Sequence, residues 1–236
     1  MTDTWRRSAQ SVATELQAIF GTRLRSVVAY GALLDGHSDG PLTCLALVDT
    51  LTISDLDACA ARAAGWHRAR VAVPLILPTD EFRESLDAFP LEYGEILRAH
   101  ETIAGENLLA GATIAPDDLR RACETQVKSH LLHLRESYME SGASPTAVSN
   151  LVRASAPAFG ALLRNVARLF GVHSSSRMDT TLEGVRIAGL SERVVADVLA
   201  LERPATVPQS DPARLFPEYL AAVEQLARTV NSWRAA

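Results

Sequence analysis

The stretch AYGALLDGHSDGPLTCLALV covers residues 29–48 and has the form of two strands joined by a turn-rich loop. It begins inside the apolar run LRSVVAYGALL (24–34) and ends inside a second apolar run, LTCLALVD (42–49). The residues between the two runs are mostly Gly, Asp, Ser and Pro, which favour turns. We therefore predict two β-strands with a loop between them.

The rest of the first half alternates helix and strand patterns. We predict helices at about 3–20, 53–67 and 80–89, and strands at 70–77 and 91–105. Thr52 or Ser54 is the expected N-cap of the second helix, and Thr79 that of the third. The last segment, LEYGEILRAHETIAG, is predicted as one long strand or two short ones. Pro74 cannot donate to a sheet ladder, so we place its strand near an edge or at a bulge.

From Pro116 onward the sequence shows only helical patterns. We predict helices at about 116–141, 145–170, 180–190, 191–203 and 212–235. Pro157 is expected to kink the second of these, because a proline inside a helix removes a backbone hydrogen bond. Strands first and helices afterwards are typical of an α+β protein. We predict an α/β domain with a small mixed sheet at residues 1–113, followed by an all-helical bundle domain at 114–236.

Composition and charge narrow the class of protein. The formal net charge of −5 argues against a nucleic-acid binder that works by neutralising phosphates. The three cysteines are odd in number and far apart, which predicts neither a zinc site nor a disulfide framework. The apolar runs are too short to span a bilayer, and the N-terminus has an amphipathic pattern and not that of a signal peptide. We expect a cytoplasmic protein without nucleic-acid or membrane partners.

The order of elements resembles the nucleotidyltransferase superfamily, which includes aminoglycoside nucleotidyltransferases. It runs from a helix to a strand ending in Tyr30-Gly31, then a loop, a second strand, later acidic residues and a helical bundle. In that family the first strand ends in Gly-Ser, the second begins with two carboxylates one residue apart, and a later strand supplies a third. Residues i and i+2 on a strand point the same way, so these carboxylates hold magnesium against a triphosphate.

When the family's motif is aligned with this sequence, the resemblance implies a site that has lost the carboxylates that bind the metal. The glycine position falls on Gly31, the serine position on Ala32, and the paired carboxylates on Leu42 and Cys44. The third carboxylate would come from one of two glutamates: Glu92 or Glu95. Since neither paired position supplies an oxygen ligand, we assign no catalytic residue, no metal ligand and no cofactor.

A second group of ligand-binding candidates lies on the first helix after Pro116. Glu124, Lys128, Arg135 and Tyr138 share one helical face, and Lys128 is the only lysine of the chain. We expect this face to border the cleft between the two domains, where related nucleotidyltransferases bind substrate. The alternative is a solvated face with a routine Glu124–Lys128 pair. The candidates for the sheet domain are Gly31, Ala32, Ser38, Asp39, Glu92 and Glu95.

Three hypotheses of function remain open from the sequence. The first is a catalytically silent nucleotidyltransferase-fold protein that binds an unknown small molecule or protein partner at the interdomain cleft. The second is an active magnesium-dependent nucleotidyltransferase with relocated carboxylates, using Asp39 and either Glu92 or Glu95. The third is a structural homo-oligomer assembled through the helical half.

Overall fold

A computed structural model describes residues 2–31, 33–34, 40–172, 174, 176–201 and 211–234. The chain divides into two compact units, Met1–Ala115 and Pro116–Ala236. The expected domain boundary after residue 113 lies just before this division. None of the helices in the described ranges combines the length and the apolar character needed to cross a membrane.

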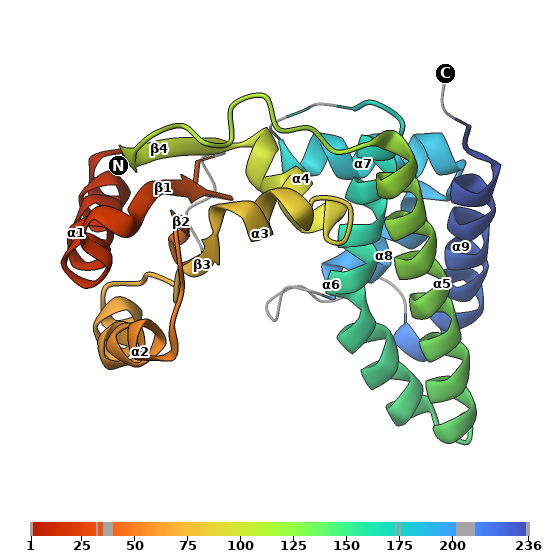
Figure 1. Cartoon of the computed structure of the whole chain (residues 1–236). Helices are drawn as coiled ribbons and strands as arrows, with labels where there is room; N and C mark the ends of the chain where they lie inside the picture. The colour runs from red at the N-terminus through yellow and green to blue at the C-terminus, as the bar shows by residue number, and fades with distance from the viewer. Residues whose placement is uncertain are drawn as a thin grey trace. The chain divides into compact units, whose positions relative to one another are not determined.

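The first unit is built on a mixed four-stranded sheet (Figure 1). Its strands are β1 (Leu24–Tyr30), β2 (Thr43–Val48), β3 (Leu75–Pro78) and β4 (His100–Gly105). Their order is β3-β2-β1-β4, with β1 antiparallel to both neighbours and β2 parallel to β3. The small mixed sheet is therefore confirmed. The strand that follows Pro74 is an edge strand, as the proline indicates.

The helices of this unit are α1 (Thr2–Phe20), the 3-10 turn η1 (Gly21–Arg23), α2 (Ile53–Arg68), α3 (Thr79–Glu84) and α4 (Pro90–Arg98). Thr52 caps α2 as predicted and forms a reciprocal capping box with Asp55. Arg23 donates two hydrogen bonds to the same carboxylate, at 2.7 and 2.8 Å, which ties the start of α2 to the turn before β1. Thr79 is not a cap, because α3 begins after Pro78 and the Thr79 hydroxyl donates to the Val48 carbonyl.

Two apolar clusters cover the two faces of the sheet. The even-numbered residues of 42–48 pack against α1 and α2 together with Val27 and Ala29 of β1. Leu45 and Leu47 point the other way, where Phe82 of α3 and Tyr93 of α4 belong to the same cluster. This alternation follows from the two-residue period of a strand, and it means that β2 is apolar on both faces.

The prediction of a strand across residues 91–98 was wrong. This segment is α4, and only its continuation at His100–Gly105 is a strand. Pro90 occupies the first turn of the helix and Glu92 follows in the same turn, which are both helix-start signals. Tyr93 and Ile96 are buried and three residues apart, so one helical face packs on the sheet.

The second unit is helical throughout its described residues, and no strand follows Pro116 in them. Its helices are α5 (Pro116–Glu140), α6 (Pro145–Leu169), α7 (Arg177–Ala188), α8 (Glu192–Ala200) and α9 (Pro212–Ser232). α6 continues through Pro157. Gly184 lets α7 approach α6 closely, because a Cβ at this position would lie 2.2 Å from the Leu163 carbonyl oxygen.

Candidate functional site

The turn after β1 begins with a glycine that the backbone requires. Gly31 has a φ of +90°, and a Cβ there would lie 3.0 Å from the Thr43 hydroxyl. Its N–H points to the Ala99 carbonyl at 3.4 Å, so this donor is directed within the protein and not at a phosphate. The other candidates of the loop, Ala32, Ser38 and Asp39, lie outside the described residues.

The two positions that the sequence assigned to paired carboxylates share one face of the sheet. Cys44 lies on β2, and Leu42 lies just before it in a parallel bridge with Val71. Both belong to the cluster under α1 and α2 and are 1% and 2% exposed. The side chains at both positions are therefore buried in the core and are not open to a metal or a triphosphate. Burial also raises the pKa of the Cys44 thiol to about 12, so it stays neutral.

Thr43 and Leu45 alternate with Cys44 along β2 and therefore lie on the opposite face of the sheet. Thr43 is paired with Tyr30, and its hydroxyl donates to the Tyr30 carbonyl at 2.5 Å. A register one residue later than the sequence suggested would put Thr43 and Leu45 at the paired positions. The two registers lead to the same chemistry, because residues 42–48 contain neither aspartate nor glutamate.

The two candidates for a third carboxylate lie on a helix and not on a later strand, which corrects the sequence prediction. Glu92 is exposed on α4, and Glu95 lies 3.7 Å from the Arg98 guanidinium. Within the strands, β3 has no acidic residue, and Glu101 of β4 accepts two hydrogen bonds of 2.8 Å from Arg6. The bonds from Arg6 lower the pKa of Glu101 and engage both of its oxygens.

The side chains at the paired positions and at the third position do not fit the magnesium site of the nucleotidyltransferase family. Mg²⁺ requires oxygen ligands in near-octahedral geometry, and here the paired positions are apolar, hydroxyl or thiol. No group of three or more His, Cys, Asp or Glu side chains in the described part of the chain is arranged to hold a metal ion.

The charged residues at the start of the candidate face on α5 form a local ion-pair group. Glu124 accepts a hydrogen bond of 2.7 Å from Arg120 and another from Lys128, one turn further along. The bonds from Lys128 and Arg120 lower the pKa of Glu124. The Lys128 side chain is 54% exposed. Glu124 and Lys128 thus form the i,i+4 pair that the alternative includes, while a role of this face in ligand binding stays a prediction.

The other two residues of that face contact a neighbouring helix of the same unit. Arg135 donates to Glu224 at 2.7 Å, and the Tyr138 ring stacks on Phe216 with centroids 4.5 Å apart. Both partners lie on α9. Arg135 and Tyr138 therefore help to hold α5 against α9.

Sequence reasoning missed a polar chain inside the helical unit. The Ser155 hydroxyl donates to the Val152 carbonyl at 3.0 Å, and the Tyr219 hydroxyl donates to Ser155 at 3.1 Å. His130 Nε2 lies 2.8 Å from the Tyr219 oxygen, and the order of donors makes it the donor there. Burial lowers the pKa of His130 to about 4, so the ring is neutral at ordinary pH. No sequence motif links residues on three different helices.

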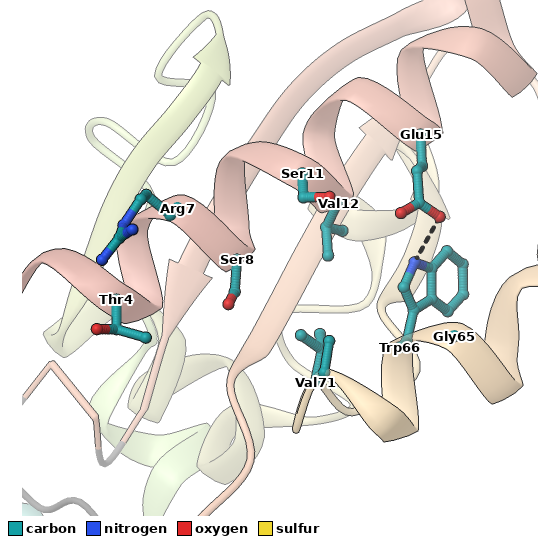
Figure 2. A pocket seen from close by; sticks show the side chains of 10 residues that line it. Thr4, Arg7, Ser8, Ser11, Val12, Glu15, Gly65, Trp66 and Val71 are labelled. Atoms are coloured by element: carbon teal, nitrogen blue, oxygen red, sulfur yellow. Dashed lines mark hydrogen bonds between the residues drawn. The ribbon is translucent and has the colours of Figure 1, made fainter.

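A small ligand would fit into either of two cavities, one in each unit. One, of about 360 Å³, lies between α1 and α2, with Thr4, Ser8, Ser11 and Glu15 on α1 and Trp66 opposite (Figure 2). None of the residues singled out from the sequence lines it. The other, of about 500 Å³, lies at one end of the helical unit and includes one of them, Glu124.

Comparison with known proteins bears on the fold. No family model matches the chain, and no curated protein matches it. Among solved structures it is similar to the crystal structure of spectinomycin adenyltransferase AAD(9) from Enterococcus faecialis with ATP and spectinomycin. The similarity has a TM-score of 0.56 at 11% identity and covers 96% of this chain and 99% of the other. The chain therefore has a nucleotidyltransferase-like α+β fold followed by a helical region, as the order of its elements predicts.

Proposed function

We propose that this chain keeps the nucleotidyltransferase-like fold as a binding scaffold and does not catalyse nucleotidyl transfer. The observation that carries the proposal is the composition of β2 and of Leu42, the residue just before it. Residues 42–48 read LTCLALV, without a carboxylate on either face. Leu42, Cys44 and Leu45 are at most 2% exposed. Nucleotidyl transfer of the family type needs metal ions to neutralise the triphosphate, and apolar side chains cannot hold them.

The turn beside β2 supports the same proposal. The Gly31 N–H is directed at Ala99, and the Thr43 hydroxyl donates to Tyr30. Both groups are engaged in holding the end of β1 and the start of β2 together. A phosphate at this turn would have to compete with these internal hydrogen bonds, which weakens the turn as an anion site.

The ligand of this scaffold is proposed to be a small molecule or a protein. ATP and spectinomycin are the first small molecules to try, because the similar solved structure contains both. Binding of either molecule does not need the missing carboxylates, as long as it involves neither a metal nor a reaction.

The test is a calorimetric titration of ATP, once with magnesium and once with a chelator, together with an assay of pyrophosphate release in the presence of spectinomycin. We expect no pyrophosphate above the level of a protein-free control. We also expect ATP binding that is absent or equal in the two titrations. Magnesium-dependent binding or pyrophosphate release would overturn the proposal.

Two variants would show which residues are responsible if pyrophosphate release is observed. Glu92→Gln and Glu95→Gln remove the two acidic side chains of α4 while preserving their size. If activity is present and either change abolishes it, the carboxylates have been relocated and the protein is an enzyme. Activity that survives both changes would point to acidic residues elsewhere and would equally refute a silent scaffold.

A further inference from the structure

Helix α2 packs on its unit with one side and turns the opposite side to solvent. The packed side is marked by the buried residues of the helix, which are Asp55, Cys59 and Trp66. An α-helix turns by about 100° per residue, so the residues opposite to these follow one another at steps of four, three, four and four. This row is the outer stripe of α2: Ile53, Asp57, Ala60, Ala64 and Arg68. All five residues are exposed.

The outer stripe is apolar over most of its length. Ile53 is 75% exposed, more than any other large apolar side chain among the described residues, and Leu56 beside the stripe is 44% exposed. The middle of the stripe consists of Ala60 and Ala64. The solvent face of a helix normally carries charged and polar residues. A single exposed apolar residue is ordinary, but a row of them along one face is typical of a surface that another protein covers.

The two charged residues of the outer stripe have opposite signs and are unpaired. Asp57 lies near the start of α2, and Arg68 is its last residue. Neither side chain forms a hydrogen bond or an ion pair in the described part of the chain, whereas Arg62 of the same helix lies 3.6 Å from Glu15. At about 1.5 Å per residue, Asp57 and Arg68 are roughly 16 Å apart along the axis, so they are too distant to pair with each other.

A stripe with an acid near one end, a base at the other and alanines between them is complementary to an antiparallel copy of itself. When two copies are related by a two-fold axis through the middle of the stripe, Ala60 of each copy faces Ala64 of the other. Asp57 of each copy then lies opposite Arg68 of the other, so the same ion pair forms twice. The alanines let the two helix axes approach to about 8 Å. A parallel arrangement would instead bring like charges together.

We propose that this protein forms a homodimer in which the outer stripes of two α2 helices pack antiparallel, with Asp57 of each copy paired to Arg68 of the other. The helix has 16 residues, so the contact is about 24 Å long and smaller than the interface of a permanent dimer. The dimer is therefore weak, with a dissociation constant on the order of 10–100 µM. Its surface lies in the sheet unit, and it does not depend on whether nucleotidyl transfer has been lost.

The first test is sedimentation equilibrium of the intact chain at concentrations from about 2 to about 500 µM, which span the expected dissociation constant. We expect the average mass to rise with concentration from that of one chain toward that of two. A mass of one chain over the whole range would overturn the proposal, since it would leave the outer stripe without a second copy as its partner.

The second test reverses the charges of the stripe. Asp57→Arg and Arg68→Asp each place like charges opposite one another, and each should weaken the dimer by about tenfold or more. The double variant restores opposite charges in the reverse order, so its dissociation constant should return to within about threefold of the wild type. Both positions are exposed, and circular dichroism verifies that each variant folds.

The matched control is Glu136→Arg, which reverses an exposed carboxylate on α5 that is also unpaired within the described residues. This change should leave the dissociation constant unchanged. Dimerisation that is insensitive to both single reversals would place the interface elsewhere and refute the assignment. A double variant as weak as the single ones would refute the antiparallel pairing.

Discussion

The buried histidine of the helical unit should make the protein sensitive to mild acid. His130 is held between α5 and the Tyr219–Ser155 chain, and burial lowers its pKa from 6.5 to about 4, with a smaller contribution from His133. Well above pH 6.5 the ring is neutral in both the folded and the unfolded chain, so its titration does not affect stability. Below this value the unfolded chain takes up a proton that the folded chain resists, and stability falls until about pH 4.

The size of this loss follows from the lowering of the pKa. At about 1.4 kcal/mol for each pH unit, the full difference corresponds to about 3 kcal/mol of unfolding free energy. His130 is only partly buried, which reduces the effect. We therefore expect a loss of about 2 kcal/mol between about pH 7 and pH 4 from this residue.

The assay compares the wild type with His130→Gln in urea unfolding followed by far-ultraviolet circular dichroism, at several pH values across this range. Glutamine can donate to the Tyr219 hydroxyl but does not titrate. Carboxylates such as Glu101 and Glu124 lose stabilisation in acid as well, but they are common to both proteins and cancel in the difference. Equal acid sensitivity of the two proteins would refute the reasoning, as would an NMR titration of the His130 ring with an ordinary pKa.

Three further substitutions probe the fold and the candidate residues through the free energy of unfolding. Gly31→Ala should destabilise the protein by about 1–2 kcal/mol, because alanine is strained at a φ of +90°, and an unchanged stability would contradict this. Gly184→Ala should cost roughly 1–3 kcal/mol, since its Cβ would force α7 away from the Leu163 carbonyl, and a stabilised variant would refute that packing. Lys128→Ala should change stability by less than about 0.5 kcal/mol, because its pair with Glu124 is exposed, and a loss of several kcal/mol would show a buried ion pair instead.

The parts of the fold that the sequence predicted correctly are those whose signals act within a few residues. Thr52 caps α2 because its hydroxyl meets an N–H three residues away, at Asp55. The long helix after Pro116 is recognisable from its first turn, where Asp117 and Asp118 follow the proline. Turn residues between two apolar runs were sufficient to predict β1 and β2. The order of strands and helices then led to the fold class.

Residues 91–98 show where local signals compete. LEYGEIL fits both an alternating strand and a helix with apolar residues three apart. The packing of Tyr93 on Phe82, with ring centroids 5.0 Å apart, stabilises the helical alternative, and this contact exists only once α3 and α4 lie on the sheet. The placement of Glu92 and Glu95 changed with it, from a strand to a helix.

Only the tertiary structure decided which face of β2 lies under which helices. The two-residue period of a strand says that Leu42 and Cys44 share a face, but it does not say that α1 and α2 cover it. Two contacts that the sequence did not predict join distant parts of the chain. Glu15 and Trp66 are 51 residues apart, and His130 and Tyr219 are 89 apart. Such contacts depend on how whole elements pack, and no pattern within a single element can encode them.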